Sequence, residues 1–291
     1  MHELIVIDVG GTTIKFGVFH HGKLFKFGSV PTPAKLADFY EVLTKKVKTL
    51  QQKYPIQGVA LSVPGAVNKK TGVIEGASAV PYIHDFAIKA EFEKRFGLPV
   101  SLENDANCAA LAEAKSGAGK DQQSLAVLVI GTGVGGAFVL NKKIWHGAHL
   151  VGGEFGYLLA TEELTLSMAA SPVSMAKRYF EKTGRKVTGK EVFALAKQGD
   201  VDAQKEVELC ISSLAKVIYA LQYSLDPELF VLGGAISNNP DLIPLLEQKL
   251  TQLLAQVQIA KVRPRLALCT YREDANLLGA AFDFEQTNRG E

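Results

Sequence analysis

A strand, a glycine turn and a returning strand occur twice in this chain, and this repeat constrains the fold more than any other feature. The first copy spans residues 4–19 and the second spans residues 125–140. Superposing Gly11 on Gly131 gives an offset of 120 residues (131 minus 11). Because glycine has no Cβ, the backbone N–H groups of such a turn can point into one concavity and bind an anion. The repeat therefore predicts two phosphate-binding turns, which together suit the two ends of a polyphosphate.

Composition indicates a globular protein and excludes several classes of function. The 291 residues are 47% hydrophobic, which allows a sizeable core, and their number allows two domains. The 32 basic residues nearly balance the 30 acidic ones without a long basic run, so nucleic acid is not expected as a partner. We expect no leader sequence, because the first strand begins almost at once without a basic segment or a cleavage site, and no apolar run is long enough for a bilayer. The widely separated cysteines Cys108, Cys210 and Cys269 favour reduced thiols, and we expect a cytoplasmic protein without membrane contact.

Apolar periodicity predicts that strands alternate with helices after each hairpin, which is typical of an α/β architecture. In the first part we expect a strand at residues 23–30, a helix at 35–54, a strand at 58–63, a helix at 85–96, a strand at 99–103 and a helix from Asn104-Asp105 to Lys115. In the second part we expect helices that begin at Ser171-Pro172 and at Thr188, a helix at 201–225, a strand at 229–232, a helix at 241–256, a strand at 266–269 and a helix at 276–284.

The second glycine turn matches the dinucleotide-binding pattern, with Gly131, Gly133 and Gly136 at the required spacing. That pattern binds a pyrophosphate only where the turn opens a helix, whose N-terminus faces the phosphates. Here the apolar residues 137–140 continue as a strand instead. The sequence therefore argues against a nicotinamide cofactor.

Three further segments combine polar side chains with helix starts or glycine turns. Residues 103–107, Glu-Asn-Asp-Ala-Asn, place more hydrogen-bonding groups at a helix start than a cap requires, and Asp105 could take a proton from a hydroxyl group. Glycines on both sides of Glu154 suggest close packing that presents this carboxylate, although a solvated turn fits equally well. The strand that runs into Gly233-Gly234 is a platform for a flat base. The histidines at 84, 146 and 149 lack metal-ligand spacing and are interpreted as ordinary loop residues.

Taken in this order, these segments resemble the ROK family of sugar kinases. The resemblance rests on Asp8-x-Gly10-Gly11-Thr12, Glu103–Asn107, Gly131-Thr132-Gly133-x-Gly135-Gly136, Gly153-Glu154-x-Gly156 and Gly233–Ile236. It implies the two-lobed actin-like ATPase fold, ribonuclease H-like and of the hexokinase type, with a duplicated core. The expected parts are an N-terminal lobe at 1–117 for sugar, phosphate and the catalytic base, a C-terminal lobe at 118–275 for the second phosphate turn and adenosine, and a terminal helix at 276–291 that packs on the N-terminal lobe.

The resemblance also implies roles for individual residues. Asp105 would be the catalytic base on a sugar hydroxyl. Substrate binding would fall to Gly65, Asn104, Glu154 and Tyr157. ATP binding would fall to Asp8, Gly10, Gly11, Thr12, Lys15, Thr132, Gly133, Gly233, Gly234 and Ala235, with Asp8 also holding Mg²⁺ through water. The implied cofactors are ATP and Mg²⁺, and the implied assembly is a homodimer.

The chain departs from the usual family pattern where that pattern binds zinc. Tyr157 stands where the family has histidine, and Leu158–Ala170 contain no cysteine, so no zinc is expected. The segments around Asp8 and Glu154 look most like the zinc-free β-glucoside kinases, which phosphorylate the 6-hydroxyl of a glucosyl unit. N-acetylmannosamine kinase and glucokinase activities stay open as alternatives. Family regulators carry a DNA-binding domain ahead of the first phosphate motif. Because that motif begins at Asp8 here, we do not expect a sugar-sensing regulator.

Overall fold

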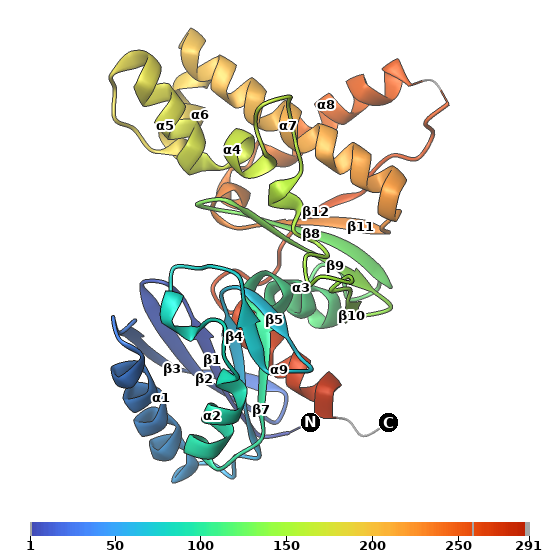
Figure 1. Ribbon diagram of the computed structural model, residues 1–291. Coiled ribbons are helices and arrows are strands. Elements are labelled where there is room, and N and C mark those ends of the chain that lie inside the picture. Colours follow the sequence, from blue (N-terminus) through green and yellow to red (C-terminus); the bar gives the residue numbers. More distant parts are fainter. Residues whose placement is uncertain (1, 258, 289–291) are drawn as a thin grey trace. The chain divides into compact units, whose positions relative to one another are not determined.

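The computed structural model describes residues 2–257 and 259–288, and these residues form two compact units (Figure 1). The N-terminal unit takes its described residues from Met1–Lys115, Gly147–Val151 and Glu273–Glu291. The C-terminal unit comprises Ser116–His146 and Gly152–Arg272. A five-stranded sheet forms the centre of each unit.

The sheet of the N-terminal unit has the strand order β3-β2-β1-β4-β7. Its strands are β1 (Leu4–Val9), β2 (Thr13–His20), β3 (Lys23–Pro31), β4 (Gly58–Val63) and β7 (Val100–Asn104). Strands β1, β4 and β7 run parallel, whereas β1, β2 and β3 are antiparallel neighbours. All residues of β1 and β4 are buried, as expected for strands that are covered on both faces.

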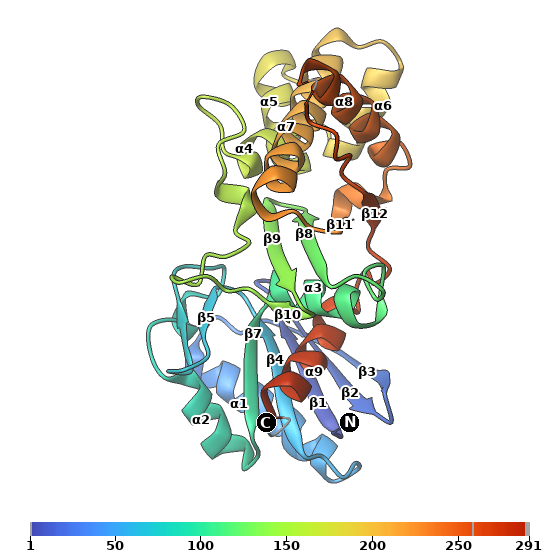
Figure 2. The same cartoon turned by 90° about the vertical axis from the view of Figure 1, so that its right-hand side faces the viewer.

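Helices cover both faces of this sheet (Figure 2). They are α1 (Leu36–Gln51) and α2 (Ile88–Phe96) on one face, and α3 (Asp105–Ser116) and α9 (Ala275–Asn288) on the other. Successive residues of a strand point to opposite faces, so Ile5 joins the core with α1 and α2 while Leu4 joins the core with α3 and α9. Helix α9 passes close to α3, because a Cβ on Gly279 would lie 1.7 Å from the carbonyl oxygen of Cys108.

The sheet of the C-terminal unit repeats this arrangement, with the order β10-β9-β8-β11-β12. Its strands are β8 (Ser124–Ile130), β9 (Val134–Leu140), β10 (Lys143–Ile144), β11 (Leu229–Gly233) and β12 (Leu266–Leu268). Strands β10, β9 and β8 are antiparallel neighbours, and β8, β11 and β12 run parallel, as in the first sheet. The predicted repeat of strand, turn and strand is therefore confirmed as a duplicated core.

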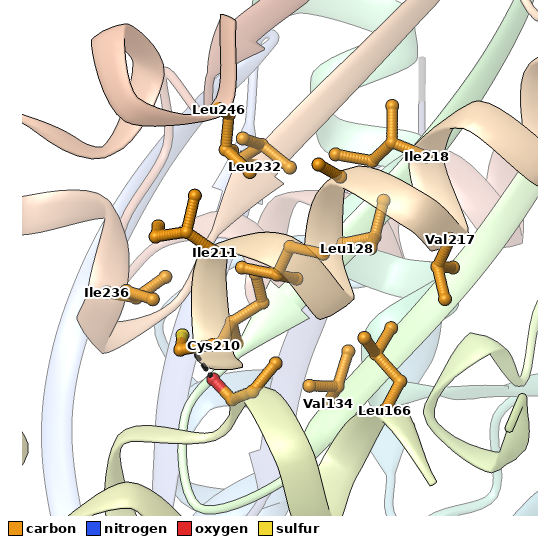
Figure 3. Packing of buried hydrophobic residues seen from close by; sticks show 14 of the residues in the cluster. Leu128, Val134, Leu166, Cys210, Ile211, Val217, Ile218, Leu232, Ile236 and Leu246 are labelled. Carbon is orange, nitrogen blue, oxygen red and sulfur yellow. Dashed lines mark hydrogen bonds between the residues drawn. The ribbon is translucent and has the colours of Figure 1, made fainter. Parts of the chain in front are cut away.

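The helices of the C-terminal unit pack against its sheet through a large apolar cluster. They are α4 (Leu166–Ala170), α5 (Pro172–Thr183), α6 (Gly189–Lys197), α7 (Val201–Leu225) and α8 (Leu242–Gln256). In the part shown in Figure 3, Leu128 and Leu232 come from strands while Cys210 and Ile211 come from α7. The Cys210 thiol donates a hydrogen bond to the carbonyl oxygen of Ala170 at 3.3 Å. Cys210 thus serves packing, as its apolar surroundings in the sequence suggest.

Most expected elements are present, with differences at their ends. The caps predicted at Ser171 and Thr188 are confirmed, and Thr188 forms a complete capping box with Glu191. Helix α2 begins at Ile88 and not at Asp85, because Asp85 has φ of 64° and its N–H bonds to the carbonyl oxygen of Ile74. The hairpin of β5 (Ala66–Asn68) and β6 (Val73–Glu75), helix α4 and the short 3₁₀ helices η1 (Pro81–Ile83), η2 (Phe155–Tyr157) and η3 (Ala235–Asn238) were not predicted. Within residues 2–257 and 259–288, no helix has both the length and the apolar character that a membrane crossing needs.

Candidate active site

Polar side chains gather at the carboxyl ends of the parallel strands in the N-terminal unit. Asp8 of β1 pairs in register with Ser62 of β4, and Ser62 pairs with Glu103 of β7. The carboxyl ends of parallel strands share one edge of a sheet, where ligands of α/β proteins commonly bind. This edge therefore brings Asp8 together with the predicted catalytic segment.

The Asp8 carboxylate is buried and held in a fixed orientation. Its Oδ1 atom accepts hydrogen bonds of 2.9 Å from the Ser62 hydroxyl and of 2.9 Å from Nδ2 of Asn276 on α9. Its Oδ2 atom lies 3.5 Å from the ammonium group of Lys15. Sequence reasoning found Asp8 and Lys15 but not Ser62 or Asn276. The register of β1 against β4 could have pointed to Ser62, whereas nothing local in the sequence points to Asn276.

The first glycine turn, between β1 and β2, is braced by its neighbours. The N–H of Gly10 bonds to the carbonyl oxygen of Thr13 at 3.0 Å, and the Thr32 hydroxyl donates to the carbonyl oxygen of Gly10 at 2.6 Å. A Cβ on Gly11 would come within 2.6 Å of the Cβ of Ala79, so this position requires glycine. Thr12 is exposed at the tip of the turn, as a phosphate contact would require.

The predicted catalytic segment, residues 103–107, joins β7 to α3. Asn104 ends β7, and its Nδ2 group donates to the carbonyl oxygen of Gly65 at 3.0 Å. Its Oδ1 atom accepts from the N–H of Asn107 at 3.2 Å, which is the hydrogen bond of a helix N-cap. Asn104 therefore supplies this cap. The Asp105 carboxylate, which accepts from the N–H of Ala106 at 2.8 Å, lies at the first residue of α3.

The electrostatic setting of Asp105 suits a general base. Burial raises the pKa of its carboxyl above the ordinary value of 3.8, and the negative charge of Asp8 raises this pKa further. The hydrogen bond from Ala106 acts in the opposite direction. A carboxylate with a raised pKa accepts a proton from a hydroxyl group more readily than a solvated one does.

Gly65 sets the position of the carbonyl group that binds Asn104. Its φ of +105° is unfavourable for other residues, and a Cβ would lie 2.6 Å from Cε1 of His84. His84 is buried and its Nε2 atom lies 2.7 Å from the Ser78 hydroxyl. His84 thus packs directly against Gly65.

The second glycine turn, in the C-terminal unit, joins β8 to β9 without an intervening helix. The N–H of Gly131 bonds to the carbonyl oxygen of Gly133 at 2.8 Å, and Thr132 is exposed at the tip. The Ser167 hydroxyl holds the start of β9, because it accepts from the N–H of Val134 at 2.9 Å and lies 3.2 Å from the carbonyl oxygen of Val134. The strand after the turn confirms that this is not a dinucleotide-binding turn that opens a helix.

The segment around Glu154 packs closely on β9. Gly153 has φ of +93°, and its Cβ would lie 2.7 Å from Cα of Ala137. A Cβ on Gly156 would lie 1.9 Å from the carbonyl oxygen of Val134. The close packing inferred from the flanking glycines is confirmed, and Glu154 is half-buried at the start of η2. Tyr157, at the end of η2, is 75% exposed.

The third glycine turn follows β11 and touches the end of β8. Gly234 has φ of 81° and ψ of −171°, a conformation that essentially only glycine adopts. A Cβ there would lie 2.4 Å from the carbonyl oxygen of Ile130, directly before the second glycine turn. Gly233 is covered by Cys269, whose Sγ atom would lie 2.6 Å from a Cβ at that position. The second and third glycine turns are therefore neighbours at one edge of the sheet.

A cavity of about 560 Å³ opens beside this third turn. Ala235 and Ile236 form one side, and Phe193 of α6 contributes an apolar ring. Two lysines of α6, Lys190 and Lys197, also line the cavity, and Lys197 lies 2.5 Å from the Asp241 carboxylate. Sequence reasoning found Gly233–Ala235 but missed the α6 residues, because the amphipathic pattern of that helix gives no sign of a ligand.

One group of three side chains among the described residues has the spacing of metal ligands. Glu3, His20 and His21 place ligand atoms within 4.8 Å of one another. The pairing of Leu4 with Phe19 puts Glu3 opposite His20, so only the strand register reveals the group. The Glu3 carboxylate lies against Nδ1 of His20 and accepts from the N–H of His21 at 3.2 Å, and these hydrogen bonds account for the grouping.

Comparison with known proteins assigns the chain to a family. The sequence model of the ROK family matches residues 4–286. This chain belongs to the ROK family. A β-glucoside kinase of Listeria monocytogenes is 31% identical over 99% of this chain and 100% of its own length. An N-acetyl-D-glucosamine kinase of Salmonella paratyphi B is 30% identical over 94% of this chain and 97% of its own length.

The structural comparison agrees with this assignment. A ROK family protein from Streptococcus pneumoniae TIGR4, solved in complex with sucrose, is 38% identical and has a TM-score of 0.90 over 99% of both chains. A ROK hexokinase from Thermus thermophilus is 30% identical and has a TM-score of 0.87, over 99% of this chain and 100% of its own. The fold is therefore the actin-like ATPase fold of the ROK hexokinases.

Proposed function

We propose that this chain, a carbohydrate kinase of the ROK family, transfers the γ-phosphoryl group of ATP to the 6-hydroxyl of a glucosyl unit in a β-glucoside. The observation that carries the proposal is the setting of Asp105, a carboxylate of raised pKa at the first residue of α3, beside an Asn104 fixed to the carbonyl of Gly65. Phosphoryl transfer needs little from a protein beyond positioning, charge neutralisation and one base.

Asp105 acts as the general base. It takes the proton of the attacking hydroxyl as that oxygen forms its bond to the γ-phosphorus and the bond to the β-phosphate oxygen breaks. ADP leaves with the electron pair of the broken bond. Asn104, the backbone at Gly65, Glu154 and Tyr157 bind the other hydroxyls of the sugar, since amide, carbonyl, carboxylate and phenol groups are suitable partners for hydroxyls.

Each unit, taken by itself, has features that suit part of a nucleotide. In the C-terminal unit, the cavity beside Ala235 and Ile236 has room for a base, and Gly234 leads from it to the turn with Thr132 and Gly133. In the N-terminal unit, Gly10, Gly11 and Thr12 form the other turn. Backbone N–H groups of glycine turns bind phosphate oxygens in many proteins. These features suit ATP, because its base fits a cavity with apolar walls and its phosphates need hydrogen-bond donors.

Asp8 fits the binding of a hydrated Mg²⁺ ion. Its buried carboxylate is oriented by Ser62 and Asn276 and stands directly before the first phosphate turn. Mg²⁺ prefers carboxylate and water oxygens, and it retains several of its waters in such sites. The ion, when bound, neutralises charge on the phosphates. Lys15, 3.5 Å from Asp8, adds a positive charge beside the same turn.

The relatives support a sugar substrate and leave its identity to experiment. One relative is named a β-glucoside kinase, and the ROK family protein from Streptococcus pneumoniae was solved in complex with sucrose, a disaccharide. The N-acetyl-D-glucosamine kinase at 30% identity favours an amino sugar as the second candidate. N-acetylmannosamine and glucose complete the alternatives.

The test is release of ADP by the purified protein with cellobiose, gentiobiose, sucrose, glucose, N-acetylglucosamine and N-acetylmannosamine. We expect cellobiose or gentiobiose to give the highest kcat/KM. Asp105→Asn should lower kcat by ~10²–10⁴ because the base is lost. Asp202→Asn, a position on α7 whose side chain is 43% exposed, is the matched control and should keep full activity. ADP release with none of the six sugars, or a fully active Asp105→Asn protein, would refute the proposal.

A further inference from the structure

A buried ion-pair network lies directly behind the segment that carries Asp105. The Glu103 side chain is 1% exposed and the Asp283 side chain is 5% exposed. The ammonium group of Lys69 lies 2.9 Å from Oε2 of Glu103 and also donates a hydrogen bond to Oδ1 of Asp283. Lys69 follows β5, Glu103 belongs to β7 and Asp283 belongs to α9. One lysine thus connects three segments of the N-terminal unit.

The other oxygen of Glu103 holds the catalytic segment. Oε1 accepts hydrogen bonds of 2.8 Å from the N–H of Asn104 and of 2.9 Å from Nδ2 of Asn107. Asp105 lies between these two residues in the chain. A single carboxylate therefore holds the Asn104 backbone on one side of the proposed base and the Asn107 side chain on the other.

A carboxylate so deeply buried needs a cation beside it. An unpaired charge in a protein interior costs several kcal/mol, and such a group takes up a proton or moves. Burial alone would lower the pKa of the Lys69 ammonium, but the charges of Glu103 and Asp283 raise it above its ordinary value. Lys69 is therefore charged at neutral pH and supplies the cation beside the Glu103 carboxylate.

We propose that Lys69 is a positioning residue for Asp105, which acts by pairing with the Glu103 carboxylate and holding it in place against Asn104 and Asn107. This inference rests on the proposed function, since it assigns Lys69 a part in the same reaction. Lys69 does not belong to any motif on which the resemblance to the ROK family rests, and sequence spacing gives no hint of its contact with Glu103.

The first test compares Lys69→Met with Lys70→Met. Lys70 is the neighbouring, exposed lysine and serves as the matched control. A displacement of about 1 Å at a reacting group can cost ~10²-fold in rate, so Lys69→Met should lower kcat by ~10²-fold and leave the KM for ATP nearly unchanged. Lys70→Met should match the wild type in both constants. A Lys69→Met protein with wild-type kcat would overturn the inference.

The second test asks whether Lys69 acts through Glu103. In the double variant Lys69→Met/Glu103→Gln, the glutamine keeps an oxygen acceptor for Asn104 and Asn107 and removes the charge at position 103, so that only Asp283 lacks its cation. Its kcat should exceed that of Lys69→Met by about tenfold. If Lys69→Met does not fold, recovery of a folded protein by the added Glu103→Gln substitution is the corresponding result. A double variant no more active and no more stable than Lys69→Met would show that Lys69 does not act through Glu103.

The two proposals fail in different ways. If the wild type releases no ADP with any sugar of the panel, the proposed function is wrong. If the wild type is active while Lys69→Met and the double variant behave like Lys70→Met, only the role of Lys69 is wrong. Lys69→Arg separates charge from shape, because its guanidinium can bridge both carboxylates and should recover most of the lost kcat.

Discussion

Replacing Gly234 by alanine is expected to weaken ATP binding more than any other function of the protein. Gly234 lies between the cavity beside Ala235 and the end of β8, with φ of 81° and ψ of −171°. For a residue with a side chain this backbone conformation costs about 1–3 kcal/mol. The added Cβ would also lie 2.4 Å from the carbonyl oxygen of Ile130, about 1 Å closer than the 3.4 Å at which ordinary contacts begin.

The turn must shift by about this distance or change its dihedral angles, and either response moves the lining of the cavity. If the whole strain of 1–3 kcal/mol appears in nucleotide binding, the KM for ATP rises about 5- to 150-fold, since 1.4 kcal/mol corresponds to tenfold. The KM for the sugar should change little, because the turn belongs to the nucleotide half of the proposed site.

The assay is steady-state ADP release at varied ATP and saturating sugar, together with a thermal melt. Gly184→Ala is the control, because Gly184 has φ of 70° and ψ of 0° and its Cβ would meet nothing within 4 Å. That variant should lose about 1 kcal/mol of stability and keep its KM for ATP. If Gly234→Ala keeps the wild-type KM for ATP and the wild-type melting temperature, the role given to this turn is wrong.

Three further predictions follow from the structure. Because burial and Asp8 raise the pKa of Asp105, log(kcat/KM) should fall with unit slope as pH drops through a value above 3.8, and an inflection at or below 3.8 would contradict the assigned base. The same raised pKa makes the folded state bind a proton more tightly than the unfolded state, so stability falls as pH rises from the unfolded to the folded pKa of Asp105. Asp105→Asn should therefore have a higher melting temperature than the wild type at pH 7, and the difference should be smaller at pH 3. Equal differences at the two pH values would count against burial as the cause of the raised pKa. Gly156→Ala should destabilise the fold by about 1–3 kcal/mol in denaturant titrations, because its Cβ would lie 1.9 Å from the carbonyl oxygen of Val134, and an unchanged midpoint would show that η2 can move away from β9.

The sequence predicts the parts of this fold that depend on neighbouring residues. Glycine turns at Gly11 and Gly131 and the apolar strands around them are local patterns, and so is the capping box at Thr188. The start of α2 could not be predicted, because the N–H of Asp85 bonds to the carbonyl oxygen of Ile74 on β6 and Asp85 has a non-helical φ of 64°. The hairpin of β5 and β6 is too short to produce a recognisable alternation.

The candidate site divides in the same way. Asp8 lies near the end of β1, Asn104 is the last residue of β7 and Asp105 follows it, so the adjacent sequence predicts that all three lie at a strand end. The partners that orient them are distant in the chain. Asn276 lies 268 residues from Asp8 and Asp283 lies 214 residues from Lys69. Only the fold brings these side chains together, and no spacing rule spans such separations.

The most direct test of the proposed reaction is the position of the phosphate on the product. The purified protein is incubated with ATP, Mg²⁺ and cellobiose, and the sugar product is examined by ³¹P–¹H correlation NMR for wild type and for Asp105→Asn. We predict that phosphorus couples to the C6 protons of a glucosyl unit with the wild type, and that this product is absent or formed at least ~10²-fold more slowly with Asp105→Asn. A phosphate on another carbon would contradict the assigned hydroxyl, and equal product formation by Asp105→Asn would contradict the assigned base.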